Sequence, residues 1–173
     1  VLESLPQMRQ VGPRLVEGTM DRLLTLLGQG DLDIVIGRTT TERYDESSVA
    51  TEVLYVEPID LVTRPGHPLF ELSEIGWSDV RSYRWVIWPR GTPIRNAMDE
   101  GLAAVGQELP VDHVESNSVT ANITMLNNSD MIGTASHRAT LMLARLRLLR
   151  ILPLELPGYG SVSMYWRKDE LHP

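Results

Sequence analysis

The sequence contains no cysteine, which excludes disulfide bonds, zinc–thiolate sites and thiol catalysis and fits a protein of a reducing compartment. Long apolar runs are also missing, because no segment approaches the roughly 20 residues that a membrane-spanning helix needs. The opening segment VLESLPQMRQ has neither the basic start nor the apolar centre of a signal peptide. We therefore expect a cytoplasmic protein that does not enter a membrane.

Positive charge is scarce as well. The chain has 16 basic and 23 acidic residues and a net charge of −7, so it carries no cationic field that would hold a polyanion. Direct binding of nucleic acid by this chain is therefore not expected. With 173 residues, of which 42% are hydrophobic, the chain is long enough for one globular domain or two small lobes.

Signatures of catalysis and of metal binding are absent from the sequence. It contains no G-x-S-x-G, Walker-loop, G-x-G-x-x-G or H-E-x-x-H motif. Glu17 and Asp33 do not form a carboxylate pair, because Asp33 lies at the amino end of a predicted strand and Glu17 at the opposite edge. We therefore expect no enzyme, no catalytic residue, no cofactor and no metal site. The histidines show no ligand spacing and are interpreted as surface or turn residues: His67, His113, His137 and His172.

The stretch VEGTMDRLLTLLGQGDLDIVIGR, residues 16–38, carries an α/β pattern. Apolar residues at positions 20, 23, 24 and 27 form the stripe of a helix for which Thr19 is a good N-cap. Consecutive apolar residues in DIVIG predict a strand covered on both faces, and residues 14–16 predict a strand before the helix. Such a βαβ unit would be parallel and would place Gly18, Thr19 and Arg38 at the carboxyl edge of the sheet.

A second group of alternating elements follows. The extended segment 53–65 contains Pro58, which argues against a central strand and for a crossing or edge segment. Ser116 or Ser118 caps one of the later helices, and the last predicted strand covers 162–166. Two α/β groups linked by two extended segments can move about a hinge. The second group comprises strand 83–89, helix 92–106, strand 111–116, helix 118–128, strand 130–136 and helix 138–147.

The polar helix starts indicate ligand binding. In parallel sheets, ligands bind beyond the carboxyl ends of the strands, where helix N-termini offer free N–H groups and a positive dipole. Arg38 adds a fixed cation there, although capping alone also explains Thr19 and Ser118. The basic segment LARLRLLR, residues 143–150, is interpreted as a solvated helix face rather than a nucleic-acid or membrane surface. The candidate ligand-binding residues are Gly18, Thr19, Arg38, Pro89, Gly91, Thr92, Ser116, Asn117 and Ser118.

These segments resemble the LysR-type transcriptional regulators. Residues 16–38 are similar to the strand, helix and G-(E/D)-L-D-L-x-I strand of that family, and EPIDLVTRPGHPL is similar to its x-P-L-x-L-V-x-x-x-x-H-P-L. The order of elements agrees through VESNSVTANITMLNNSDMIGTAS, so the resemblance covers almost the whole chain. Residues 16–38 also resemble a subgroup that includes regulators of sugar uptake and of protocatechuate-type aromatic catabolism.

The resemblance implies the effector-binding part of such a regulator, with a type 2 periplasmic-binding-protein-like fold. This is an α/β fold of two Rossmann-like lobes joined by two crossover strands. Lobe I would comprise residues 1–55 and 158–173 without the family's first strand, and lobe II residues 56–157. The family's winged helix-turn-helix has no match in this sequence, so we expect DNA to be bound only through that absent domain.

The same resemblance assigns roles to individual positions. Thr19 matches the effector-contacting residue after the second strand of lobe I, and Arg38 the one after the third. Residues 89–92 match the loop that opens the first helix of lobe II, and residues 116–118 match a second helix start facing the cleft. In the family, homodimers and usually homotetramers form through a lobe I helix and a lobe II helix, here near residues 1–9 and 118–128.

Two hypotheses from different functional classes remain at this point. The first is an effector-sensing domain that binds an organic acid, an aromatic catabolite or a sugar derivative between its lobes and controls transcription through oligomerisation. The alternative is a solute-binding protein of the same fold that serves a transporter. An enzyme on this scaffold, such as a dehydratase-like domain, lacks an acid–base constellation in the sequence.

Overall fold

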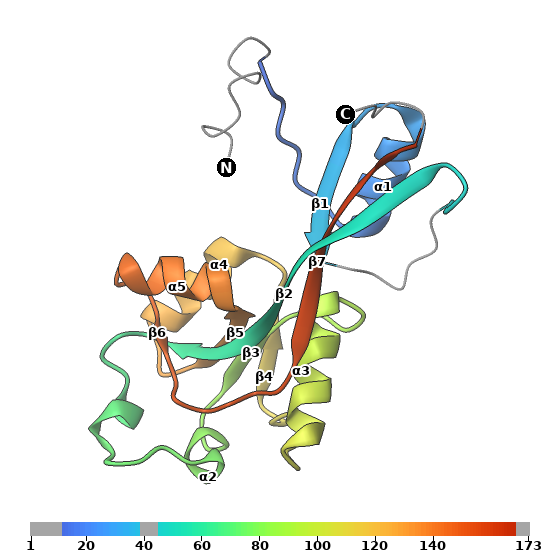
Figure 1. The fold of residues 1–173 in the computed structure, drawn as a ribbon. Helices are drawn as coiled ribbons and strands as arrows, with labels where there is room; N and C mark the ends of the chain where they lie inside the picture. Colours follow the sequence, from blue (N-terminus) through green and yellow to red (C-terminus); the bar gives the residue numbers. More distant parts are fainter. Residues whose placement is uncertain (1–11, 39–44, 169–173) are drawn as a thin grey trace. The chain divides into compact units, whose positions relative to one another are not determined.

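The computed structural model describes residues 12–38 and 45–168, and these belong to two compact units. Strands β2 (Val49–Thr63) and β7 (Tyr159–Arg167) run from one unit into the other, as can be followed in Figure 1, and the last three residues of β1 (Ile34–Arg38) also belong to the larger unit. The two crossover strands and the α/β class that the sequence predicts are therefore confirmed. The smaller unit contains the described residues 12–35, 45–50 and 165–168, and the larger unit contains residues 36–38 and 51–164.

The smaller unit is built around the helix α1 (Met20–Gln29). The sequence predicts its apolar stripe, and Leu23, Leu24 and Leu27 are buried in a cluster. The helix ends at Gly30, whose φ of 83° lies in the left-handed region that residues with a Cβ avoid. The cluster also contains Val35 from β1 (Ile34–Arg38), Val49 from β2 and Tyr165 from β7.

The strand predicted at residues 14–16 is wrong. Residues 12–19 form neither helix nor strand, and the side chain of Leu15 is 83% exposed. Because Leu15 is not buried, it contributes no hydrophobic free energy that would offset the conformational entropy lost when a strand forms. The βαβ unit predicted for this part of the chain is therefore absent from the described residues, where the sheet neighbour of β1 is β7.

The sheet has the strand order β1-β7-β2-β5-β3-β4, and the short β6 (Arg150–Ile151) pairs with β2. In the larger unit, β3 (Trp85–Ile87) lies between β4 (His113–Glu115) and β5 (Ile132–Ser136). Strand β3 is parallel to both neighbours, whereas β5 is antiparallel to β2. The carboxyl ends of three parallel strands therefore lie at one edge of the sheet.

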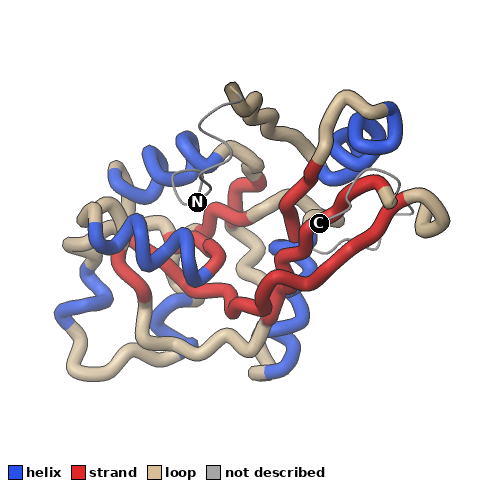
Figure 2. Tube along the Cα trace, turned by 45° about the horizontal axis from the view of Figure 1, so that its top comes forward, coloured by secondary structure: helices blue, strands red, loops and turns tan. Residues whose placement is uncertain are grey.

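Helices cover both faces of the sheet in the larger unit, as Figures 1 and 2 show. Trp85 and Ile87 of β3 point to a core shared with η3, α2 and α3, whereas Val86 points to a core shared with α4 and α5. Successive residues of β3 thus alternate between two apolar cores, which explains the continuous apolar run WVI. The helices are η3 (Pro68–Glu71), α2 (Trp77–Val80), α3 (Pro93–Ala104), α4 (Val119–Asn127) and α5 (His137–Arg145).

Most element predictions for the second group are confirmed. Pro58 lies in a crossing segment, as predicted, because β2 has residues in both units. The part of the interpretation that argues against a central strand is wrong. Strand β2 continues through Pro58 and lies between β7 and β5 in the strand order. Pairing with β5 begins one residue later, where Ile59 is opposite Ser136, and the Ile59 N–H donates to the carbonyl of Gly158. The proline therefore stands directly before the pairing with β5, and its missing N–H removes no hydrogen bond from that ladder.

Candidate functional site

The carboxyl edge of the parallel strands in the larger unit is the candidate site. Strands β3, β4 and β5 are followed there by helices α3, α4 and α5, so three helix N-termini lie at the same edge. The Ser116 N–H donates to the carbonyl of Ile87 at 2.9 Å, which joins the loops that follow β3 and β4. The structure therefore brings together two of the helix starts predicted from the sequence, residues 89–92 and 116–118.

The start of α3 is shaped by a tight loop. The Thr92 hydroxyl donates to the carbonyl of Pro89 at 2.8 Å and accepts from the Arg95 N–H at 3.4 Å. Gly91 has a φ of 80°, which a residue with a Cβ adopts only with strain. Within the described residues, the N–H of Ile94 has no acceptor, because it lies in the first turn of the helix.

The start of α4 is capped by serines. The Ser118 hydroxyl accepts from the Ala121 N–H at 3.3 Å, and the Ser118 N–H donates to the Ser116 hydroxyl at 3.2 Å. Asn117 and Ser118 are exposed. Over the described part of the chain, the N–H groups of Val119 and Thr120 find no protein acceptor. This helix start, like that of α3, offers free N–H donors and a positive dipole to an anion or a hydroxyl oxygen.

Arg95 holds these two helix starts in place, and sequence reasoning missed it. Its side chain is buried, and Nη1 donates to the Trp88 carbonyl at 3.1 Å and to Glu115 Oε1 at 3.0 Å. Its Nε donates to Asp99 at 2.9 Å. Burial acts to lower the pKa of Arg95, but the bonds to Asp99 and Glu115 outweigh it and hold the pKa above its ordinary value. The available signal was an Arg–Asp pair at i, i+4 beside buried positions of α3.

The N-terminus of α5 already holds a carboxylate of the protein itself. Glu57 is buried, and its Oε2 accepts from the Arg138 N–H at 3.0 Å. Its Oε1 accepts from Arg38 Nη2 at 3.3 Å. The rule that ligands bind at helix starts beyond the carboxyl ends of parallel strands also applies to the segment after β5. Ser136 and His137 could therefore have been included among the candidate ligand-binding residues. Glu57 could not have been found in this way, because 81 residues separate it from its partner Arg138 in the sequence.

Arg38 lies in the larger unit with its charge compensated by Glu57. Burial lowers the pKa of its guanidinium below the ordinary value, although the Glu57 carboxylate opposes the shift. Its Nη1 is buried and has no hydrogen-bond partner among the described residues. A Cβ on Gly160 would overlap this guanidinium. A ligand reaching Arg38 would therefore find one unpartnered nitrogen, Nη1, and a partner carboxylate rather than a free cation.

Gly18 and Thr19 lie at the start of α1 in the smaller unit. Thr19 is the N-cap in extended backbone, but its side chain makes no cap hydrogen bond. Its hydroxyl instead lies near the Asp21 carboxylate and is the largest of the causes that hold the pKa of Asp21 below its usual range. Both Gly18 and Thr19 are exposed. Their backbone and hydroxyl groups are accessible to solvent in this unit.

Over residues 12–38 and 45–168, no three His, Asp or Glu side chains are grouped so that they could hold a metal ion. In the same residues, no helix has the length and apolar character to span a bilayer. His67 is buried and structural, since its Nδ1 accepts from the Leu69 N–H at 3.2 Å and its Nε2 lies 3.1 Å from the Asp130 carbonyl.

Known regulators are similar to this chain in sequence. The family model of the LysR substrate binding domain matches residues 6–173. The HTH-type transcriptional regulator GalR of Pseudomonas putida is 35% identical over 159 residues, which is 91% of this chain and 39% of that protein. PcaQ of Agrobacterium fabrum is 29% identical over 158 residues, 90% of this chain and 50% of that protein. The chain thus spans half or less of the length of these relatives.

Solved structures give the same fold. The cofactor-binding domain of the Cbl transcriptional regulator has a TM-score of 0.71 and 21% identity, covering 98% of this chain and 77% of that domain. The effector-binding domain of QuiR in complex with shikimate has a TM-score of 0.63 and 16% identity, covering 90% of this chain and 72% of that domain. The two-lobed periplasmic-binding-protein-like architecture expected from the sequence is thereby confirmed.

Proposed function

The chain belongs to the LysR substrate-binding domain family, and from this premise we propose that it senses a small organic effector for a transcriptional regulator. As an effector-binding domain, it would bind its ligand between the two lobes, 1–55 with 158–173 and 56–157. A ligand that binds one relative arrangement of the lobes more tightly than another shifts the population toward that arrangement. In the longer protein, this shift would be passed to a DNA-binding domain outside this chain.

The observation that supports this proposal is the pair of helix starts at the carboxyl edge of β3 and β4. Free N–H donors of Ile94, Val119 and Thr120 lie at that edge, and the charged Arg95 fixes the loops before them. Such donors suit a carboxylate or a hydroxyl-rich ligand, so the effector would be an organic acid, an aromatic catabolite or a sugar derivative. The residues proposed to contact it remain Gly18, Thr19, Arg38, Pro89, Gly91, Thr92, Ser116, Asn117 and Ser118.

A thermal-shift screen followed by calorimetry tests the proposal. The compounds would be sugars, aromatic acids and the ring-opened products of aromatic acids. A ligand at 100 times its dissociation constant should add about 2.7 kcal/mol to the free energy of unfolding. The Arg38→Ala variant should bind an anionic hit more weakly. An unchanged affinity would contradict the assignment of Arg38, and a screen without any hit would contradict the proposed ligand class.

Assembly is part of the same proposal. We infer that the full regulator forms homodimers or homotetramers in which α4 and the segment near residues 1–9 of a neighbour meet; the latter segment lies outside the described residues. Sedimentation velocity on the full-length protein measures the assembly state directly. A full-length protein that stays monomeric at micromolar concentration would contradict this part. The similarity to transcriptional regulators favours this function over that of a solute-binding protein that serves a transporter.

A further inference from the structure

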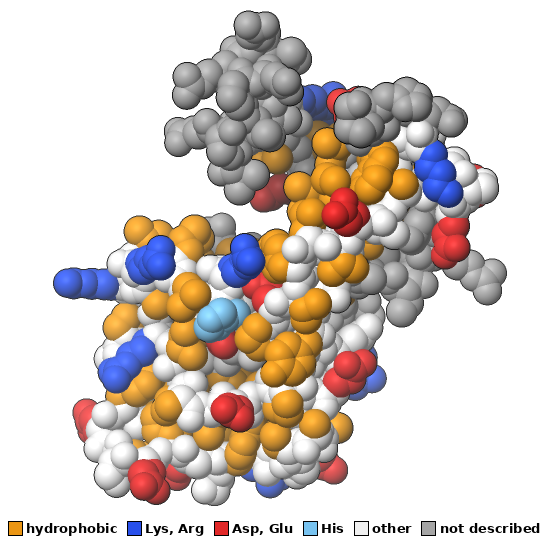
Figure 3. Space-filling model, viewed as in Figure 1, with side chains coloured by type: hydrophobic (Ala, Val, Ile, Leu, Met, Phe, Trp, Pro, Cys, Tyr) orange, Lys and Arg blue, Asp and Glu red, His pale blue; other side chains and the backbone are white. Residues whose placement is uncertain are grey.

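Helix α5 and the turn after it present apolar side chains to solvent. Leu141 and Met142 are 41% and 54% exposed, and Leu146 and Leu148 are 61% and 37% exposed. Their neighbour Leu143 is buried in the core of the larger unit, so the helix has an inner apolar face and a second, outer one. We name these four exposed residues, together with Arg145 and Arg147, the α5 surface. Figure 3 shows hydrophobic and basic side chains side by side over α5.

The α5 surface is basic in an acidic chain. Between Asp130 and Glu155 the sequence contains four arginines and no acidic residue, although the net charge of the chain is −7. Arg138 lies over the Tyr55 ring and Arg150 over the Phe70 ring. Within the part of the chain that the structure describes, Arg145 and Arg147 make no ion pair. Two guanidinium groups beside exposed leucines are therefore uncompensated.

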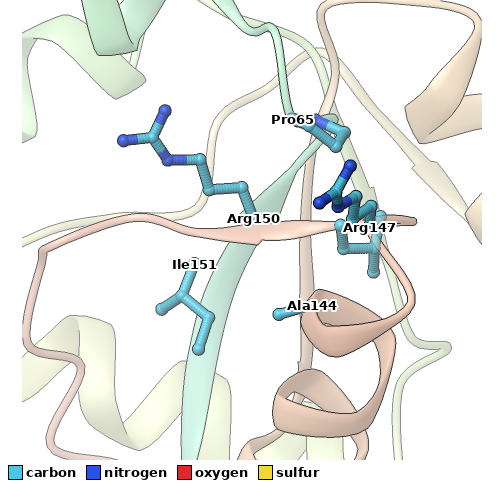
Figure 4. Close-up of a pocket in the computed structure, with 6 residues that line it drawn as sticks. Pro65, Ala144, Arg147, Arg150 and Ile151 are labelled. Atoms are coloured by element: carbon cyan, nitrogen blue, oxygen red, sulfur yellow. The ribbon is translucent and has the colours of Figure 1, made fainter.

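A surface hollow of about 430 Å³ lies next to these arginines. Figure 4 shows the guanidinium of Arg147 beside Pro65 and that of Arg150 directed to the other side, with Ala144 on α5 and Ile151 on the strand that carries Arg150. The floor is apolar, and its rim is cationic. Such a hollow accepts one apolar side chain of a partner while the arginines pair with neighbouring carboxylates. It is lined by Pro65, Ala144, Arg147, Leu149, Arg150 and Ile151.

Arg147 occupies a backbone position that suits glycine. Its φ of 58° lies in the left-handed region, and it follows the last turn of α5. The Leu148 N–H donates to Leu143 and the Arg147 N–H to Ala144, which is a Schellman-type ending of the helix. A non-glycine residue in this conformation costs on the order of 1 kcal/mol. Replacing Arg147 with glycine therefore removes the charge without adding strain.

We propose that the α5 surface docks an acidic amphipathic segment of another protein. Charge complementarity selects this occupant, because the arginines are unpaired and the leucines between them need an apolar partner. A short acidic segment carries few negative charges, so it meets less long-range repulsion from a chain with a net charge of −7 than a nucleic acid or an anionic membrane does. A second copy in a symmetric arrangement would place arginines against arginines. The surface is separate from the effector edge, so the inference does not rest on the proposed function.

Fluorescence anisotropy with a synthetic peptide tests the proposal. The peptide would be a labelled helix with leucines at i, i+3, i+4 and i+7 and glutamates elsewhere, and its control would carry lysines in place of the glutamates. Wild type should bind the glutamate peptide, and Arg147→Gly and Leu146→Gln should weaken binding about tenfold. The Arg22→Gln and Val111→Gln variants change residues of the same types outside the α5 surface and should bind as wild type does. Arg147→Gly should melt no lower than wild type, which separates lost binding from lost folding.

Several results would overturn the proposal. Equal binding of the lysine peptide would show that charge does not select the partner. Absence of binding to the glutamate peptide would exclude an acidic segment of this kind. If sedimentation velocity shows that wild type self-associates and that Leu146→Gln abolishes this association, the occupant is a second copy of the chain. Phosphatidylglycerol vesicles that bind wild type but not Arg147→Gly would identify a membrane surface instead.

Discussion

Arg95 shows how one buried charge organises two loops that are apart in the sequence. Replacing it with methionine keeps much of its volume but leaves the Trp88 carbonyl and the Glu115 carboxylate without their donor. We expect Arg95→Met to lower the free energy of unfolding by about 2–4 kcal/mol, measured by urea denaturation. Arg95→Lys should restore part of the stability, because one ammonium can replace some but not all of the bonds.

Arg95→Lys also distinguishes a role of Arg95 in positioning the two helix starts from a role in stability alone. At a temperature where Arg95→Lys is fully folded, it should still bind a hit from the ligand screen more weakly than wild type, because the two helix starts are less well fixed. Isothermal titration calorimetry measures this affinity. Wild-type affinity in folded Arg95→Lys would show that Arg95 supports the core alone.

Gly160 is a second residue at which packing is tightly constrained, because the Arg38 guanidinium lies against it. Because a Cβ at this position would overlap the Arg38 guanidinium, Gly160→Ala should displace Arg38 from Glu57 and destabilise the protein by about 1–3 kcal/mol. Gly28→Ala is the matched control, since nothing lies within 4 Å of a Cβ there and α1 should gain up to about 1 kcal/mol. Equal effects of the two substitutions in urea denaturation would contradict the packing of Arg38 on Gly160.

At the scale of elements, the spacing of apolar residues predicted the helices and strands that depend on local sequence alone. The apolar spacing of α1 and the strand–helix alternation from β3 to α5 could be predicted, because each depends on residues within one element. The strand predicted at residues 14–16 failed because strand formation depends on burial and a partner. Glu57 and Arg95 were missed for a related reason: their hydrogen bonds join residues that only the folded sheet brings together.

The α4 helix start allows a test of anion binding that leaves the fold intact. Aspartate is as good an N-cap as serine, so Ser118→Asp should change the free energy of unfolding by less than about 0.5 kcal/mol. Its carboxylate would accept the free N–H groups and repel an anionic ligand, lowering the affinity for such a ligand about tenfold or more. Isothermal titration measures this loss. An anionic hit that binds Ser118→Asp and wild type equally well does not use this helix start.

At the scale of the whole molecule, the site residues divide between two units that β2 and β7 connect. Ile94, Val119 and Thr120 belong to the larger unit, and Gly18 and Thr19 belong to the smaller one. Hydrogen exchange can therefore test whether a ligand uses both. With a ligand at 100 times its dissociation constant, the exchange of contacted amides should slow by up to about 100-fold. We expect this protection at the starts of α3 and α4 and also at Gly18 and Thr19. Protection confined to the larger unit would contradict the assignment of Gly18 and Thr19, whereas protection in neither place would remove the carboxyl edge of β3 and β4 as the site.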